Sequence, residues 1–396
     1  MNYNYAHIEL NITSKTKNAI GMIIFNNPLY LVGACLSAWT HREFINKYGL
    51  NIDLVVMVDK TIYKYKEELE KYFDYVELID LIEMKLSPKY NIIYKYSQWM
   101  KYSISKWNIL KLDNYDKILF LDIDILPIDK DFYSVFDFDT PCIMVRGLNF
   151  EPNVLASPEI FIDIDNLRDY KNHEYSKLAL ELKHSLDAGF VLVRPSKTLF
   201  DEYIEFIKIC EGLEGYISKY DSGVDETTLL MFFMFYKKIP VHLIPYNYAP
   251  IPWDKFPYDK NEMKGINFIS MVKPWIKLPI IQWSDENIWH RIAKKALDVH
   301  SVITKIYIKY LIDELYKFYF NWKKNISKSN SPYNMESIKS SNLKNKTFKI
   351  FEYLKLNPKE NLTLEQMEYI IKQTVMIHEL MNKKLYVPIR ELEIIV

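Results

Sequence analysis

The sequence has no apolar run long enough to cross a bilayer, few cysteines and no excess of charge of either sign. The strongest apolar run near the start, residues 19–25, has the length of a strand, whereas a membrane-spanning helix needs about 20 apolar residues. Residues 1–17 are polar where a signal peptide would be apolar, so we expect no cleaved leader. The 51 basic residues balance the 51 acidic ones, which removes the overall attraction that nucleic-acid binding needs.

The three cysteines, Cys35, Cys142 and Cys210, are widely spaced and lie among apolar residues. This pattern favours buried free thiols over disulfides or a zinc site, and we therefore expect a reducing, cytoplasmic setting. Hydrophobic residues make up 49% and charged residues 26% of the chain, which is typical of a folded globular protein. A chain of 396 residues accommodates one large domain with an appendage, or two domains.

Short apolar runs alternate with longer amphipathic stretches over roughly the first 275 residues, which predicts an α/β fold with an open sheet flanked by helices. We expect strands at residues 20–25, 53–58, 75–79, 117–121, 142–145, 189–194, 242–244 and 266–269. We expect helices around residues 31–47, 97–111, 197–210 and 226–236. Open sheets of this kind bind ligands beyond the carboxyl ends of their strands.

After Trp289 the pattern becomes helical, at residues 300–323 and 364–384, with a Ser/Asn/Lys-rich linker at 325–346 between them. We therefore divide the chain into a sheet domain at 1–290 and a helical C-terminal region at 291–396. The apolar stripes of these helices indicate core packing, or alternatively a partner surface that could support a homodimer.

Two carboxylates, Asp122 and Asp124, end the predicted buried strand at 117–121. In an extended chain alternate side chains share a side, so both carboxylates should face one ligand. Such a pair can hold Mg²⁺ or Mn²⁺, which neutralises a diphosphate. The alternative interpretation is an ordinary acidic turn after a strand.

Further polar segments stand in order along the chain. Residues 24–30, Ile-Phe-Asn-Asn-Pro-Leu-Tyr, follow the first strand, and Lys106 lies sixteen residues before Asp122. On a helical reading Lys106 falls in an apolar stripe, where a snorkelling surface lysine is the alternative. Residues 187–189, Asp-Ala-Gly, precede a predicted strand, 221–226 read Asp-Ser-Gly-Val-Asp-Glu, and 267–275 read Asn-Phe-Ile-Ser-Met-Val-Lys-Pro-Trp.

Taken together, residues 20–275 resemble the glycogenin-type members of the family-eight retaining glycosyltransferases, which have the GT-A fold. The resemblance implies a metal at Asp122, Asp124 and Asn267. It implies catalytic roles at Asp122, Lys106, Asp187, Asp225 and Glu226. It also implies that the donor is bound by Ile24, Asn26, Tyr30, Lys106, Asp122, Ile123, Asp124, Ala188, Gly189, Ser270 and Lys273.

The sequence departs from the family pattern at four of these positions. Asn26 replaces a threonine, and Glu226 replaces a glutamine. Asn267 stands at the metal-binding histidine, and Ser270 at a glycine that contacts phosphate. An amide oxygen is a poorer ligand than imidazole for a transition metal, so activity should depend less on Mn²⁺ than is usual for the family.

The leading prediction is therefore transfer of a hexose, glucose by resemblance, from a UDP-sugar to a glycan or protein acceptor with retention of configuration. The resemblance also suggests self-glycosylation on a tyrosine in the stretch that contains Tyr246, Tyr248 and Tyr258. A non-catalytic nucleotide-sugar-binding or scaffold protein is the main alternative. Nucleotidyl transfer fits the same layout, but it needs a glycine-rich triphosphate loop, and the nine glycines are scattered.

Overall fold

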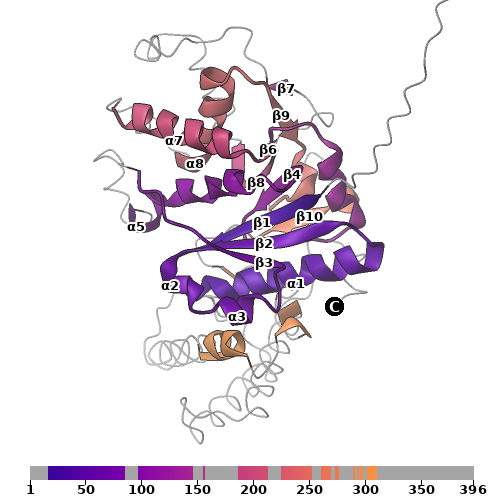
Figure 1. The fold of residues 1–396 in the computed structure, drawn as a ribbon. Helices are drawn as coiled ribbons and strands as arrows, with labels where there is room; N and C mark the ends of the chain where they lie inside the picture. Colours follow the sequence, from indigo (N-terminus) through magenta and orange to yellow (C-terminus); the bar gives the residue numbers. More distant parts are fainter. Residues whose placement is uncertain are drawn as a thin grey trace, which may run out of the picture.

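The computed structural model describes residues 17–84, 97–145, 155–156, 186–212, 224–251, 260–268, 273–275, 289, 292–293, 295–297 and 301–309. These residues form an eight-stranded sheet in the order β3-β2-β1-β4-β8-β6-β9-β7 and a small sheet of β10 with β5 (Figure 1). The strands are β1 (Asn18–Ile24), β2 (Ile52–Val58), β3 (Tyr75–Leu78), β4 (Lys117–Leu121), β5 (Ile125–Pro127), β6 (Cys142–Val145), β7 (Leu155–Ala156), β8 (Leu186–Val193), β9 (Val241–Ile244) and β10 (Gly265–Asn267).

Strand directions make the large sheet mixed. Strands β3, β2, β1 and β4 run parallel, and β8 is antiparallel to both β4 and β6. Strand β9 is parallel to β6 and antiparallel to β7. The expected fold class, an open mixed α/β sheet flanked by helices, is confirmed.

Helices cover both faces of the sheet (Figure 1). On one face lie α1 (Tyr30–Tyr48), α2 (Lys60–Tyr63) and α3 (Lys66–Leu69). On the other lie the 3-10 helix η1 (Ser103–Lys111), α7 (Lys197–Gly212) and α8 (Val224–Met231). The remaining short helices are α5 (Ser97–Met100), η2 (Lys130–Asp137), the π-helical η4 (Phe232–Tyr236), η5 (Tyr246–Tyr248) and η6 (Lys260–Glu262).

The apolar strands divide their side chains between two hydrophobic clusters. In β2, Leu54 and Val56 pack on the α1 side, whereas Val55 and Met57 pack on the η1 side. Alternate residues of a strand point to opposite faces, and both faces are covered here, so the strands read as continuous apolar runs.

Four sequence expectations differ from the structure. Residues 97–111 form α5, a turn and then η1 instead of one helix, and residues 226–236 divide between α8 and η4. Strand β8 begins at Leu186, earlier than expected, and the short strands β5 and β7 were not predicted. The other expected strands agree within about two residues, the usual scatter of element ends.

Residues after the sheet region join the same core. Trp289, Ile303 and Tyr307 belong to the hydrophobic cluster around α1, and the Tyr72 hydroxyl donates to the Ala296 carbonyl at 3.2 Å. The predicted linker at 325–346 and helix at 364–384 lie outside the described residues, and the domain boundary at 290 stays a prediction.

Two composition-based expectations can be followed in the part of the chain that the structure describes. Cys35 and Cys142 are free and buried, as predicted, and burial raises the pKa of both thiols. None of the helices described here combines the length and apolar character that a bilayer crossing requires.

Candidate active site

Polar residues follow three neighbouring parallel strands at the point where each strand ends. Asn26 lies two residues after β1, Asp59 directly follows β2, and Asp122 directly follows β4. Because the three strands are parallel, their carboxyl ends meet at one edge of the sheet. This edge is where open α/β sheets bind ligands.

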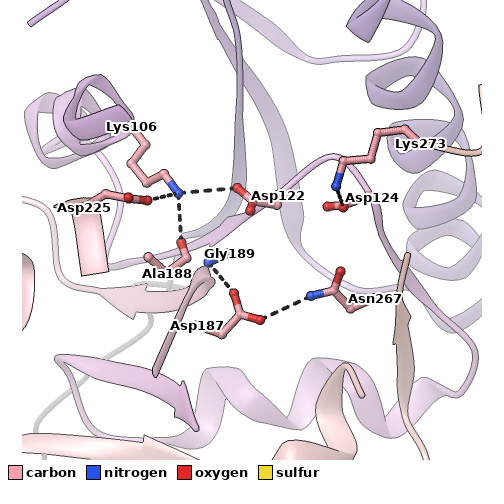
Figure 2. Close-up of polar contacts among 9 residues, drawn as sticks. All are labelled: Lys106, Asp122, Asp124, Asp187, Ala188, Gly189, Asp225, Asn267 and Lys273. Atoms are coloured by element: carbon pink, nitrogen blue, oxygen red, sulfur yellow. Dashed lines mark hydrogen bonds and ion pairs between the residues drawn. The ribbon is translucent and has the colours of Figure 1, made fainter. Parts of the chain in front are cut away.

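Asp122 and Asp124 occupy a turn between β4 and β5. The Ile125 N–H donates to the Asp122 carbonyl at 3.1 Å, and the Asp122 N–H donates to the Gly189 carbonyl at 2.8 Å. The chain is therefore turned here, whereas the sequence prediction assumed an extended chain, and the shared ligand of the two carboxylates stays a prediction. The turn gives each carboxylate a different lysine (Figure 2).

Lys106 is a buried cation between two elements. Its Nζ lies 2.5 Å from an Asp225 carboxylate oxygen and 3.5 Å from one of Asp122, and it donates to the Ala188 carbonyl at 3.4 Å (Figure 2). Only 8% of Lys106 is exposed, so it does not snorkel to the surface. Burial lowers the pKa of Lys106, but Asp122, Asp225 and Glu226 outweigh burial and raise the pKa above its ordinary value.

The Asp122 carboxyl is poised between two protonation states. Burial raises its pKa, the Lys106 ammonium opposes this, and the carboxylates of Asp124, Asp187 and Asp225 add to the rise, which gives a pKa of about 6. Its side chain is still 43% exposed, so a ligand can reach it. A carboxyl with a raised pKa among other carboxylates is typical of a functional site.

Lys273 forms an ion pair with Asp124, whose side chain is only 4% exposed (Figure 2). Burial lowers the pKa of Lys273, and the nearby Asp124 and Asp122 carboxylates outweigh it and raise the pKa. Burial raises the pKa of the nearby Tyr30 hydroxyl, the Lys273 charge lowers it, and the Asp124 and Asp122 charges raise it. The Tyr30 ring also meets the Trp275 ring edge to face, with centroids 5.9 Å apart.

The segment 187–189 lies within β8, whereas the strand was predicted to begin only at Gly189. Asp187 accepts from the Gly189 N–H at 2.9 Å through Oδ1 and from the Asn267 amide at 3.3 Å through Oδ2 (Figure 2). A Cβ on Gly189 would lie 2.7 Å from Asp122 Oδ2 and 2.9 Å from Asp187 Oδ1. Two carboxylates therefore occupy the space that the missing side chain of Gly189 leaves.

Asn267 is placed by the pairing of β10 with β5, in which it stands opposite Ile125. Its amide nitrogen is held by Asp187, while its Oδ1 is buried and has no hydrogen-bond donor among the residues that the structure describes. Figure 2 shows this oxygen on the side that faces Asp124. A buried acceptor with no donor is costly, and it indicates a missing ligand.

The three proposed metal ligands fit a hard cation. Within the described ranges, no three His, Cys, Asp or Glu side chains are grouped to hold a metal. The donor set that the resemblance implies consists instead of the carboxylates of Asp122 and Asp124 with the buried Asn267 oxygen. Oxygen donors of this kind suit Mg²⁺ better than a transition metal.

The segment after β1, in which Ile24, Asn26 and Tyr30 are predicted to bind the donor, begins with a tight turn. The Asn27 N–H donates to the Phe25 carbonyl at 2.6 Å, which puts Asn26 at φ 60°. Asn tolerates this left-handed backbone better than a β-branched residue, which explains why Asn26 can replace the family's threonine. Ile24 is buried at the end of β1.

Asp59 is the residue of this edge that the sequence reasoning missed. Its buried carboxylate accepts from the Asn26 N–H at 3.4 Å and from the Ile62 N–H at 3.2 Å, and so it caps α2. The available signal was an acid directly after a strand, the same signal that identified Asp122. Asp59 fixes the turn that carries Asn26.

The other expected site residues are placed less centrally. Ile123 is buried in the turn, and Glu226 lies in the first turn of α8 beside Asp225. Ser270 lies outside the described residues.

Two of the proposed acceptor tyrosines are buried. Tyr246 and Tyr248 are each 1% exposed. The Tyr246 hydroxyl accepts from the Ile251 N–H at 3.1 Å, and the Tyr248 hydroxyl lies 2.7 Å from the Ser134 hydroxyl. Tyr258 lies outside the described residues.

Comparison with known proteins gives distant relatives. No family model matches the sequence. The uncharacterized protein R707 of Acanthamoeba polyphaga mimivirus is 24% identical over 260 residues, which is 65% of this chain and 82% of that protein.

The similar solved structures include several glycosyltransferases. The galactosyltransferase LgtC, in complex with donor and acceptor sugar analogs, is 16% identical with a TM-score of 0.34, over 65% of this chain and 89% of that chain. A glycosyltransferase involved in the glycosylation of the major capsid of PBCV-1 is 11% identical with a TM-score of 0.30, over 64% and 95% of the two chains. Mouse xyloside xylosyltransferase 1 is 12% identical with a TM-score of 0.29, over 59% and 86%. At TM-scores this low, the roles of the residues must be inferred from the site itself.

Proposed function

We propose that this chain is a glycosyltransferase that moves a hexose from a UDP-sugar to an acceptor with retention of configuration. The supporting observation is that two largely buried lysines meet the carboxylates after β4: Lys106 contacts Asp122, and Lys273 contacts Asp124. Burying charges costs desolvation free energy, so a charged cluster at a ligand-binding sheet edge favours a site over a structural role. Its two cations suit a diphosphate and its carboxylates suit sugar hydroxyls.

The donor would lie across this cluster with its base at the end of β1. Tyr30 offers a ring face for the uracil, next to Ile24 and Asn26. Lys273 would stabilise the negative charge that develops on the departing UDP, and Lys106 would contribute from the opposite side of Asp122. The base, the diphosphate and the sugar of the donor would then lie in this order along the cluster.

The sugar would lie between β8 and α8. Asp187 and Asp225 would frame it, with Ala188 and Gly189 beneath it and Glu226 beside Asp225. Asp225 is paired with Lys106 at 2.5 Å, which fixes the direction of its carboxylate. We propose retention of configuration on the resemblance of the sequence segments. We propose glucose as the transferred sugar on the resemblance of the sequence segments.

Asp122, Asp124 and Asn267 would hold a divalent cation, which when bound neutralises part of the charge of the diphosphate. Because Lys106 and Lys273 share this task, we expect partial turnover to survive EDTA, with weaker donor binding. Lys273→Ala should therefore reduce turnover more than removal of the metal does. Full loss with EDTA and full recovery at micromolar Mn²⁺ would contradict this division of labour.

The acceptor is proposed to be a glycan or protein other than Tyr246 and Tyr248, because both hydroxyls are bonded and both side chains are buried. Self-glycosylation, if it occurs, would use a different tyrosine. Intact-mass measurement after incubation with donor, followed by peptide mapping, tests this directly.

The deciding experiment is incubation of the full chain with a panel of UDP-sugars, with and without EDTA, followed by measurement of UDP release and product mass. We expect UDP-glucose to be consumed and the double variant Asp122→Ala, Asp124→Ala to lose this activity while keeping its circular dichroism spectrum. Asp131→Ala, an exposed acid in η2, is the matched control.

Each alternative function has its own result in this experiment. UDP binding without UDP release would indicate a non-catalytic nucleotide-sugar-binding protein. Pyrophosphate release from a nucleoside triphosphate would indicate nucleotidyl transfer. Wild-type turnover in the double variant would refute the site.

A further inference from the structure

Two different cations could neutralise the Asp124 carboxylate: the Lys273 ammonium and a divalent metal ion. In the structure Asp124 is paired with the Lys273 ammonium, and only 4% of its side chain is exposed. A carboxylate this enclosed has little room for additional partners. Any ion that binds Asp124 must therefore contend with Lys273.

The side chain of Asn267 supports the second of these, a metal ion next to Asp124. Its Oδ1 is buried without a donor, 2% of the residue is exposed, and the oxygen is on the side that faces Asp124 (Figure 2). Asp187 holds the amide nitrogen at 3.3 Å, which fixes the direction of this oxygen. Lys273 is not among the donors to Asn267 Oδ1, so the lysine satisfies Asp124 but leaves a neighbouring acceptor unused.

A divalent cation would satisfy both groups. It would take one oxygen from Asp124, one from Asn267 and one from Asp122, whose side chain is still accessible. The same ion would repel the Lys273 ammonium from Asp124, because like charges at contact distance repel strongly away from bulk water. The two occupants of Asp124 are therefore mutually exclusive.

We propose that Lys273 is an exchangeable counter-ion: it neutralises Asp124 in the ligand-free chain, and a divalent cation displaces it and frees its ammonium for the diphosphate of the donor. This inference rests on the proposed function for the identity of the diphosphate. No bond is made or broken in the exchange, and the lysine keeps its proton. It follows that cation and UDP bind cooperatively, each increasing the affinity of the other by the same factor.

The exchange makes a prediction that direct bridging of metal and diphosphate does not. If Lys273 competes with the cation, Lys273→Met should bind Mg²⁺ alone more tightly than the wild type does, by about tenfold, within the usual range of coupling between sites. If the lysine only contacts the diphosphate, the Mg²⁺ affinity of the UDP-free chain should not change. Lys273→Arg retains a competing cation and should resemble the wild type.

The test is a calorimetric titration of the full chain with Mg²⁺, in the absence and presence of UDP, for the wild type, Lys273→Met and Lys273→Arg. Lys264→Met is the matched control, because Lys264 lies over the Tyr248 ring at 4.0 Å and donates to Ser134, away from the carboxylates. Thermal unfolding of each variant confirms that it is folded. Asn267→Ala should weaken Mg²⁺ binding in every background.

Tighter Mg²⁺ binding by Lys273→Met, with Lys264→Met unchanged, supports the exchange. Unchanged or weaker binding by folded Lys273→Met overturns it. The Mg²⁺ titration without UDP uses no sugar donor, so it tests the exchange of Lys273 independently of the proposed glycosyl transfer. Turnover of UDP-glucose without tighter binding would refute the exchange alone, and tighter binding without turnover of any UDP-sugar would refute the glycosyl transfer alone.

Discussion

Removing the Lys106 charge should destabilise the fold more than the loss of an ordinary lysine. At an effective dielectric constant of about 20, unit charges 2.5 Å apart, the Lys106–Asp225 separation, attract by about 7 kcal/mol. Desolvation of both groups offsets part of this attraction, and breaking a buried pair costs about 3–5 kcal/mol because the remaining charge stays buried. We expect Lys106→Met to lower the free energy of unfolding by about 3–5 kcal/mol at pH 8.

The loss should depend on pH. Without the ammonium, the pKa of the Asp122 carboxyl rises further above its unfolded value, because the Lys106 charge no longer opposes the effect of burial. The folded state then binds more protons than the unfolded state, and stability is gained as the pH falls. The difference in unfolding free energy between the wild type and Lys106→Met should therefore be smaller at pH 5 than at pH 8.

Urea unfolding followed by tryptophan fluorescence at both pH values measures this difference. Lys101→Met is the matched control, because its ion pair with Glu83 lies on the surface and should contribute little. Adding Asp225→Leu to Lys106→Met should restore part of the stability, since the uncompensated charge is removed. A loss that is below about 1 kcal/mol, or equal at the two pH values, would refute this reasoning.

Three further outcomes follow from the structure. Gly189→Ala places a methyl group against the Asp122 and Asp187 carboxylates, so donor turnover should fall at least tenfold in a kinetic assay. The free energy of unfolding should fall by about 1–3 kcal/mol. Unchanged kinetics would contradict the packing. Burial lowers the pKa of His41 to about 3. The free energy of unfolding of the wild type, relative to that of His41→Leu, should therefore fall below about pH 6.5, by up to about 1.4 kcal/mol per pH unit. Parallel pH profiles of the two proteins in urea unfolding would exclude this. Asn267→His should tighten Mn²⁺ binding, measured by electron paramagnetic resonance, and equal affinities would show that residue 267 is not a ligand.

The sheet was predictable because its strands are apolar on both faces and are separated by amphipathic stretches. The shortest strands and some strand ends were not predictable. Strand β5 has three residues and ends in Pro127, which leaves too little periodicity to identify it. Asp187 is a type that strands disfavour, and the strand was predicted to begin at Gly189. The structure instead begins β8 at Leu186, and the Asp122 N–H to Gly189 carbonyl bond continues the pairing of β4 with β8.

The site was identified in part because its acids follow strands, a signal that lies in the sequence itself. The burial of Lys106 depended on a detail that the sequence did not show. Every residue of η1 from Ser103 to Leu110 is buried, so no alternation of apolar and polar faces marks Lys106 as an inward-facing residue. Its partner Asp225 lies more than a hundred residues away, and no local pattern joins the two.

The pairing of β10 with β5 places a limit on how the sequence of this protein can vary in length. Asn267 reaches the site because it faces Ile125, and its N–H is fixed by the Pro250 carbonyl at 3.0 Å. Insertions between Tyr248 and Gly265 leave that register intact if these bonds are kept. Within β10, however, one added residue would turn position 267 to the other face, and two would restore the face but shift it by about 7 Å along the strand. Homologues that keep this chemistry should therefore differ in length before β10 and never inside it.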